Sequence, residues 1–196
     1  MDDKINKAIE VLKQGGIVVF PTDTAYGVGC RIDDEKAVER LLKLKRRPES
    51  QAVPVLVDSI EMAQRYLLPI PGEVLKLMQK YWPGGLTIVF PCKASLVPEK
   101  VRGKGQTLGV RWPDHLTVKN LIYGIGVPLL GPSANFHSEA TPYKFSDLNP
   151  KFVSQVDLVL KEETFRQQPS TVIDCSLKPW KIIRQGAIRV DLGIMN

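Results

Sequence analysis

The first apolar residues of the chain recur at helical spacing. Ile5 and Leu12 bound a set of four apolar positions at i, i+3, i+4 and i+7, and a Gly-Gly pair follows at residues 15–16. This pattern predicts an amphipathic helix that ends at the glycines. Residues 17–20 are a β-branched and aromatic run, which predicts a buried strand directly after the helix.

Helical spacing and strand-like runs alternate along the rest of the chain. Capping residues come before helical stripes at Asp33–Asp34 and Ser59, and Pro71 opens a third stripe. These stripes predict three further helices. Another helix is predicted over residues 116–123, after which a glycine follows. Predicted strands cover residues 53–57, 86–90, 107–112, 127–130, 156–160, 170–175, 181–184 and 187–190.

The order of these elements indicates the fold class. Helices interleave with strands irregularly, without a continuous β-α-β rhythm, so we expect an open, twisted, mixed α/β sheet flanked by helices. A length of 196 residues favours one domain, residues 1–196. The chain has no GxGxxG and no GxxxxGK[ST] segment, so any phosphate site must be built in another way.

Composition limits the kinds of ligand and the location that we expect for this protein. The net charge of +6 favours an anionic partner, either nucleic acid or a nucleotide, and weak non-specific RNA binding is expected from it. No apolar run is long enough to cross a membrane, and the N-terminus has no signal-peptide pattern, so we expect a cytoplasmic protein. Cys30, Cys92 and Cys175 are far apart, and His115 and His137 have no ligands at metal-binding spacing, so no protein-held metal site is predicted.

Polar residues follow the strand at 17–20. Thr22, Asp23, Thr24 and Tyr26 are expected on a loop at the carboxyl end of that strand, where open α/β sheets bind ligands. An alternative is a turn closed by side-chain hydroxyls, with Tyr26 in the core.

Two basic residues stand where the second helix ends. Lys45 and Arg47 precede Pro48, so the chain leaves the helix there and one of these side chains can reach a phosphate. The alternative is that these cations only balance the helix dipole.

Arg111 shares one face of its predicted strand with Thr107 and Gly109, because the three lie at period two. A buried or cleft-facing arginine needs an anion. That anion is either a substrate carboxylate or a structural aspartate such as Asp114 or Asp174.

Further hydroxyls and an amide follow later strands. Residues 131–135 present Ser133 and Asn135 on a turn after a strand, as phosphate-binding turns do. Ser170 and Arg184 add a hydroxyl and a fourth candidate cation. The segment 82–87 is predicted to be a structural turn held by Trp82.

Taken in order, these segments resemble the YrdC-like family, which contains the threonylcarbamoyl-AMP synthases that begin the t6A modification of tRNA. The resemblance covers almost the whole chain, and seven motifs in the right order carry it. They are residues 21–27 (PTDTAYG), 45–48 (KRRP), 82–84 (WPG), 111–113 (RWP), 132–135 (PSAN), 170–172 (STV) and 184–186 (RQG).

The resemblance implies a concave, positively charged cleft and the synthesis of threonylcarbamoyl-AMP and pyrophosphate from L-threonine, bicarbonate and ATP. Mg²⁺ is expected to be held mainly through the ATP phosphates, and a tRNA threonylcarbamoyl transferase is the expected downstream partner. The implied catalytic cations are Lys45 and Arg47; the implied L-threonine site is Thr24, Tyr26, Arg111 and Ser170; the implied ATP site is Arg47, Thr107, Ser133, Asn135, Thr141 and Arg184.

Two positions depart from the family pattern. Gln51 stands where many members have an asparagine, and Leu56 stands where they have a histidine. One other function remains open: a paralogue that binds nucleotide or double-stranded RNA in the same cleft without making the adenylate. A carbamoyl-transfer module that acts on carbamoyl phosphate is disfavoured, because such modules usually sit within much longer chains.

Overall fold

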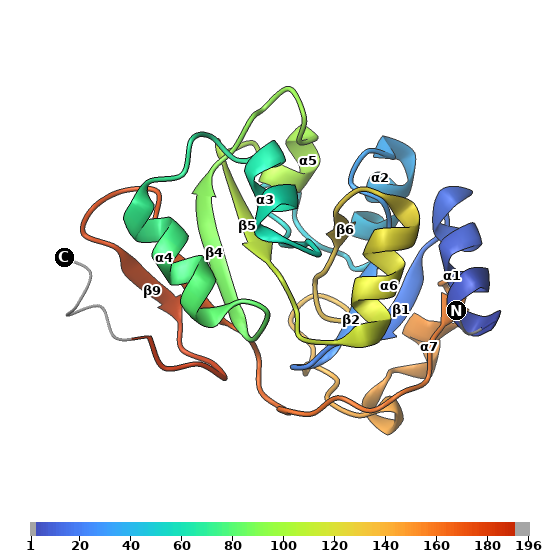
Figure 1. Ribbon diagram of the computed structural model, residues 1–196. Coiled ribbons are helices and arrows are strands. Elements are labelled where there is room, and N and C mark those ends of the chain that lie inside the picture. Colours follow the sequence, from blue (N-terminus) through green and yellow to red (C-terminus); the bar gives the residue numbers. More distant parts are fainter. Residues whose placement is uncertain (1–2, 191–196) are drawn as a thin grey trace.

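Two mixed β-sheets make up the centre of the computed structural model, which describes residues 3–190 (Figure 1). The smaller sheet has the order β2-β1-β7, and the larger one has the order β6-β3-β5-β4-β8-β9. The strands are β1 (Val18–Pro21), β2 (Tyr26–Gly29), β3 (Val55–Leu56), β4 (Leu86–Pro91), β5 (Thr107–Arg111), β6 (Leu129–Leu130), β7 (Leu158–Val159), β8 (Thr171–Asp174) and β9 (Lys181–Arg184).

Each sheet contains both parallel and antiparallel pairs. Strand β1 runs antiparallel to β2 and parallel to β7, while β4 runs antiparallel to β5 and parallel to β8. The predicted class, a twisted mixed α/β sheet flanked by helices, is therefore confirmed. The prediction of one sheet is corrected to two, because short bridges replace a continuous ladder between them.

The two sheets meet where β2 lies beside β6. Isolated bridges join Gly27 to Ser133 and Arg31 to Leu129, and the Val28 amide donates to the carbonyl of Pro132 at 2.9 Å. This seam brings the loop after β1 close to the turn after β6. Those two polar segments were expected separately at strand ends, and the seam places them at one site.

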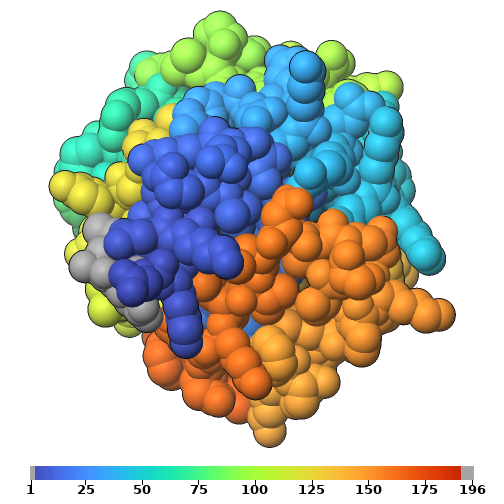
Figure 2. Space-filling model, turned by 90° about the vertical axis from the view of Figure 1, so that its right-hand side faces the viewer, coloured from blue at the N-terminus to red at the C-terminus, as the bar shows by residue number. Residues whose placement is uncertain are grey.

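Helices cover both sheets. The first helix packs against α6 and β1, and Figure 2 shows this N-terminal region beside the orange segment that contains α7. None of the described helices is long and apolar enough to cross a bilayer. The helices are α1 (Asp3–Lys13), α2 (Glu35–Leu44), α3 (Ile60–Tyr66), α4 (Gly72–Tyr81), α5 (Glu99–Arg102), α6 (Leu116–Ile125) and α7 (Pro150–Val153), with a 3₁₀ turn at Phe145–Asp147.

The caps explain where the predicted helices begin. The Asp34 carboxylate accepts from the Ala37 amide at 3.0 Å, and the Ser59 hydroxyl accepts from the Met62 amide at 3.1 Å. Each bond satisfies an amide that the first helical turn leaves unpaired. Apolar side chains of both sheets and of the longer helices form one buried cluster.

Two predictions about strands are wrong. Tyr26 was expected on a loop, but it begins β2 and pairs with Pro21. Residues 187–190 form no strand, because the Ile188 amide donates to the side chain of Thr171 at 3.1 Å rather than to a neighbouring strand.

Candidate functional site

A cavity of about 360 Å³ opens beside the seam between the two sheets. Nine of the eleven candidate residues line it, although they come from separate motifs. Lys45 and Asn135 are the two that do not. The nine are Thr24, Tyr26, Arg47, Thr107, Arg111, Ser133, Thr141, Ser170 and Arg184.

Alternation along β5 aims three of its residues into this cavity. Thr107, Gly109 and Arg111 all line it, which confirms the predicted shared face. Strand β4 contributes Thr87 and Val89 at the same period. The floor of the cavity is therefore one face of the larger sheet, and its polar groups sit at fixed strand positions.

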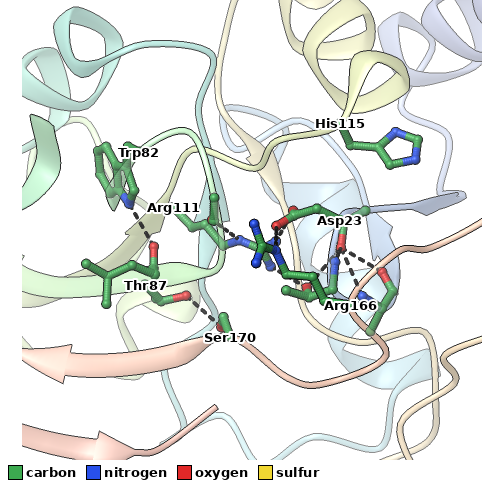
Figure 3. Close-up of polar contacts among 12 residues, drawn as sticks. Asp23, Trp82, Thr87, Arg111, His115, Arg166 and Ser170 are labelled. Carbon is green, nitrogen blue, oxygen red and sulfur yellow. Dashed lines mark hydrogen bonds and ion pairs between the residues drawn. The ribbon is translucent and has the colours of Figure 1, made fainter. Parts of the chain in front are cut away.

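Arg111 is the most constrained cation of the site. It is buried, and its Nε donates to the carbonyl of Gly84 at 3.0 Å, while Nη1 donates to the Thr24 hydroxyl at 2.7 Å. Its Nη2 forms an ion pair with Asp23 (Figure 3). Burial lowers the pKa of the Arg111 guanidinium, and the Asp23 carboxylate opposes that shift.

Asp23 joins two cations. One of its carboxylate oxygens pairs with Arg111, and the other lies 3.5 Å from the Nε of Arg166. The alternative of a structural aspartate therefore holds, but neither Asp114 nor Asp174 fills the role. The sequence pattern placed Asp23 on the loop after β1 but did not reveal Arg111 as its partner, because the two residues lie 88 positions apart.

The loop after β1 has features of both structures considered for it, a polar loop at a ligand site and a turn closed by a side-chain hydroxyl. The Thr22 hydroxyl accepts from the amides of Thr24 and Ala25, both at 3.1 Å, and so closes a side-chain turn. Tyr26 is buried, and its hydroxyl donates to the carbonyl of Glu162 and accepts from the Glu162 amide at 3.2 Å. Burial raises the pKa of Tyr26. The turn therefore presents Thr24, while Tyr26 fastens a distant segment.

Lys45 lies one layer behind the cavity. Its buried Nζ donates to the carbonyls of Ser133 and Asn135, the latter at 2.7 Å. The Asn135 side chain accepts from the Ser133 hydroxyl at 2.6 Å and donates to the carbonyl of Glu139 at 2.7 Å. In this geometry both residues hold the turn that presents Ser133. Burial and the nearby Arg47 lower the pKa of Lys45 to about 7.

Arg47 and Arg184 reach the cavity from opposite parts of the chain. Arg47 donates to the carbonyl of Ala52 at 2.7 Å and is half-buried, and burial lowers its pKa. Arg184 donates to both the carbonyl and the hydroxyl of Ser170 at 3.0 Å. Both guanidinium groups are thus held by neutral acceptors, which leaves their charge free to meet an anion.

The charged side chains that line the cavity are all positive. Arg47, Arg111 and Arg184 are the charged members of the lining, and it includes no carboxylate. Within residues 3–190, no cluster of three His, Cys, Asp or Glu side chains could hold a metal ion. An anion that entered the cavity would meet Arg47 and Arg184, which are held by neutral acceptors, and Arg111, which Asp23 already pairs.

These segments match a known family. A family model of the Sua5/YciO/YrdC proteins, described as "Telomere recombination", matches residues 10–186. The chain belongs to this family.

Curated relatives of this chain in the Sua5/YciO/YrdC family include a named synthase and an uncharacterised protein, and they differ in length. The chain is 31% identical to threonylcarbamoyl-AMP synthase of Bacillus subtilis over its whole length, which is 60% of the relative. It is 27% identical to the uncharacterised protein YciO of Escherichia coli, over 93% of this chain and 88% of YciO. The chain thus spans only about 55–60% of the first curated synthases that it matches.

Solved structures of the Sua5/YciO/YrdC family share the fold. Sua5 of Pyrococcus abyssi, crystallised with L-threonine, has a TM-score of 0.88 and 32% identity, covering 93% of this chain and 54% of that one. YciO of E. coli has a TM-score of 0.87 and 26% identity, covering 96% and 91%.

The two departures from the YrdC-like pattern differ in position. Gln51 is exposed and lies outside the lining, where its carbonyl accepts from Arg47 Nε at 3.3 Å. Leu56 is buried and lines the cavity. Leu56 therefore changes the wall that a ligand meets, whereas Gln51 supports Arg47 through its backbone.

Sequence reasoning missed Thr87 at this site. The segment 82–87 was assigned to structure alone, and the Trp82 indole does donate to the carbonyl of Leu86 at 2.7 Å. The position of Thr87 could have identified it. It carries a hydroxyl on a buried strand and lies two residues before Val89, so both side chains face the cavity.

The lowered pKa of Lys45 leads to a prediction about stability. The unfolded chain keeps the Lys45 proton up to about pH 10.5, whereas the folded chain releases it from about pH 7. Stability contributed by this site therefore rises with pH between those values. In urea unfolding, the wild type should gain stability relative to Lys45→Met as the pH is raised from 7 to 10.

Lys43→Met is the matched control, because Lys43 is exposed in the last turn of α2, the helix that Lys45 caps. Its difference from the wild type should not follow the trend of Lys45. A flat difference between Lys45→Met and the wild type across this range would contradict the assignment.

Proposed function

We propose that this chain makes threonylcarbamoyl-AMP from L-threonine, bicarbonate and ATP, as the first step of tRNA t6A modification. The observation that carries the proposal is the convergence of nine candidate residues from separate motifs on one cavity. Family membership and the likeness to the B. subtilis synthase support it. Because the chain spans 60% of that relative, the activity is proposed for the chain itself and tested on it.

The proposed reaction has two steps. The threonine amine adds to bicarbonate and water leaves, which gives a carbamate. A carbamate oxygen then attacks the α-phosphorus of ATP, and the bond to pyrophosphate breaks. The attacking and attacked groups are both anionic, so the site must neutralise charge and hold them in line.

The proposed threonine site lies around Arg111. Its guanidinium is already oriented by Asp23, Gly84 and Thr24, and an arginine has five N–H donors, so two remain for a carboxylate. The Thr24 and Ser170 hydroxyls line the same cavity. A carboxylate bound here would need little rearrangement of its partners.

The proposed ATP site uses the other two arginines. Arg47 and Arg184 supply charge, and Thr107, Ser133 and Thr141 supply hydroxyls along the lining. The lining has no carboxylate to coordinate Mg²⁺, a donor set that fits an ion brought in with the nucleotide. Such an ion would neutralise phosphate charge. Lys45 and Asn135 would act on ATP through the turn at Ser133 that they hold.

A second candidate function has support from the charge of the cavity. Its three arginines, with no carboxylate among the lining side chains, would also suit a protein of this fold that binds phosphates without the synthase reaction. With a net charge of +6, such a protein would bind nucleotide or double-stranded RNA through phosphate contacts.

The first test is pyrophosphate release. In the proposed reaction, release of pyrophosphate from ATP requires L-threonine and bicarbonate together. L-serine should support a rate about fivefold lower, because one lost methyl contact is worth ~1 kcal/mol. A coupled pyrophosphate assay with each component withheld in turn measures this. Release that persists without threonine and bicarbonate would contradict the proposal.

The second test separates a specific phosphate contact from diffuse charge. Arg47→Ala should weaken ATP binding roughly ten- to a hundredfold, because charged hydrogen bonds are worth ~1.5–3 kcal/mol. Arg46→Ala is the control: Arg46 is exposed, lies 4.4 Å from the Phe136 ring centroid and does not line the cavity. Calorimetric titration with Mg-ATP should show little change for Arg46→Ala. Equal losses in both variants would mean that only net charge matters.

A further inference from the structure

Thr87 points from β4 into the cavity and has one polar partner. It is 5% exposed, and its hydroxyl lies 2.9 Å from the Ser170 hydroxyl (Figure 3). The Trp82 indole fixes the carbonyl just before it, that of Leu86. Within residues 3–190, Ser170 is the only hydrogen-bond partner of the Thr87 hydroxyl. The position of Thr87 is therefore set by β4 and by Trp82 of the WPG turn, residues 82–84.

Arg184 limits what the Ser170 hydroxyl can do. The guanidinium is a donor only, and its Nη2 donates to Ser170 Oγ at 3.0 Å. A serine hydroxyl has one proton and two acceptor positions. If Thr87 donates to the second acceptor position, the proton of Ser170 is left to point into the cavity. In the reverse direction, Ser170 would give its proton to Thr87 and keep none for a ligand.

We propose that Thr87 is a positioning residue that makes the Ser170 hydroxyl a hydrogen-bond donor toward the carboxylate of the amino-acid substrate. The role rests on the proposed function, since it needs an anionic acceptor beside Ser170. An acceptor in the cavity favours the arrangement in which Thr87 donates to Ser170, because the chain of hydroxyls then ends on the anion. A ligand group that only donates, such as an ammonium, would find no acceptor position free on Ser170.

The packing around Thr87 allows its hydroxyl to be removed alone. Gly109 pairs with Val89 and is a diagonal neighbour of Thr87 on β5, where an added Cβ would be 3.6 Å from the Thr87 methyl group. A valine at position 87 keeps that methyl group and the β-branch that suits a strand. Thr87→Val therefore deletes the hydrogen bond, while Thr87→Ser restores it with a smaller side chain.

The test is the affinity for L-threonine, measured by calorimetry on the full chain. One neutral hydrogen bond corresponds to about a three- to tenfold change in affinity. Thr87→Val should weaken binding by this factor, and Thr87→Ser should stay within about twofold of the wild type. The double variant Thr87→Val/Ser170→Ala should bind no more weakly than Ser170→Ala, because Thr87 acts through Ser170.

Thr117→Val is the matched control. Thr117 is also buried and donates one hydrogen bond, to the carboxylate of Glu162 at 2.5 Å, but neither residue lines the cavity. It should leave threonine affinity unchanged. Urea unfolding of each variant identifies any loss of fold, and Thr87→Ala, which also lacks the hydroxyl, takes the place of Thr87→Val if that variant does not fold.

Three results would overturn the role of Thr87. They are unchanged affinity in Thr87→Val, failure of Thr87→Ser to restore binding, and losses that multiply in the double variant. Multiplying losses would mean that Thr87 contacts the ligand independently of Ser170. A wild-type chain that binds no L-threonine would overturn the proposed function itself, which this experiment reports separately.

Discussion

The buried ion pair between Arg111 and Asp23 is the constraint on which the site depends. It links β5 of the larger sheet to the loop that follows β1 of the smaller one. Removing one partner of such a pair typically costs about 3–5 kcal/mol, because the other charge is left buried alone. The pair adds less net stability than that figure suggests, since both charges were first taken out of water. Its contribution is to fix where a guanidinium stands in the cavity before any ligand arrives.

Much of the fold follows from local sequence pattern. The first helix, the helices capped by Asp34 and Ser59, and the strands around residues 86–90 and 107–112 lie where periodicity predicts them. Two features could not be predicted. The helix Glu99–Arg102 has four residues, too few for a periodic signal. The chain divides into two sheets because only isolated bridges join the regions of β2 and β6, and side-chain period does not reveal which distant strands pair.

Only part of the candidate site could be predicted, because the pairing of distant strands brings its residues together. Motifs at strand ends identified residues whose roles stay predictions, and the structure brings nine of them to one cavity. Lys45 and Asn135 lie behind it because the Lys45 ammonium is satisfied by the carbonyls of the turn at Ser133. Asp23 and Thr87 were missed as partners of Arg111 and Ser170, because those contacts span 88 and 83 residues of chain. Contacts of that range come from sheet topology, which the sequence pattern does not reveal.

We expect the three arginines, the preset ion pair and the row of hydroxyls to serve one reaction rather than general binding of phosphates. The most direct measurement is mass spectrometry of the products after the chain is incubated with Mg-ATP, L-threonine and ¹³C-bicarbonate. The proposed reaction predicts threonylcarbamoyl-AMP that carries one ¹³C atom and that disappears when either threonine or ATP is withheld. Absence of the labelled product, while the chain still binds ATP or double-stranded RNA, would contradict it.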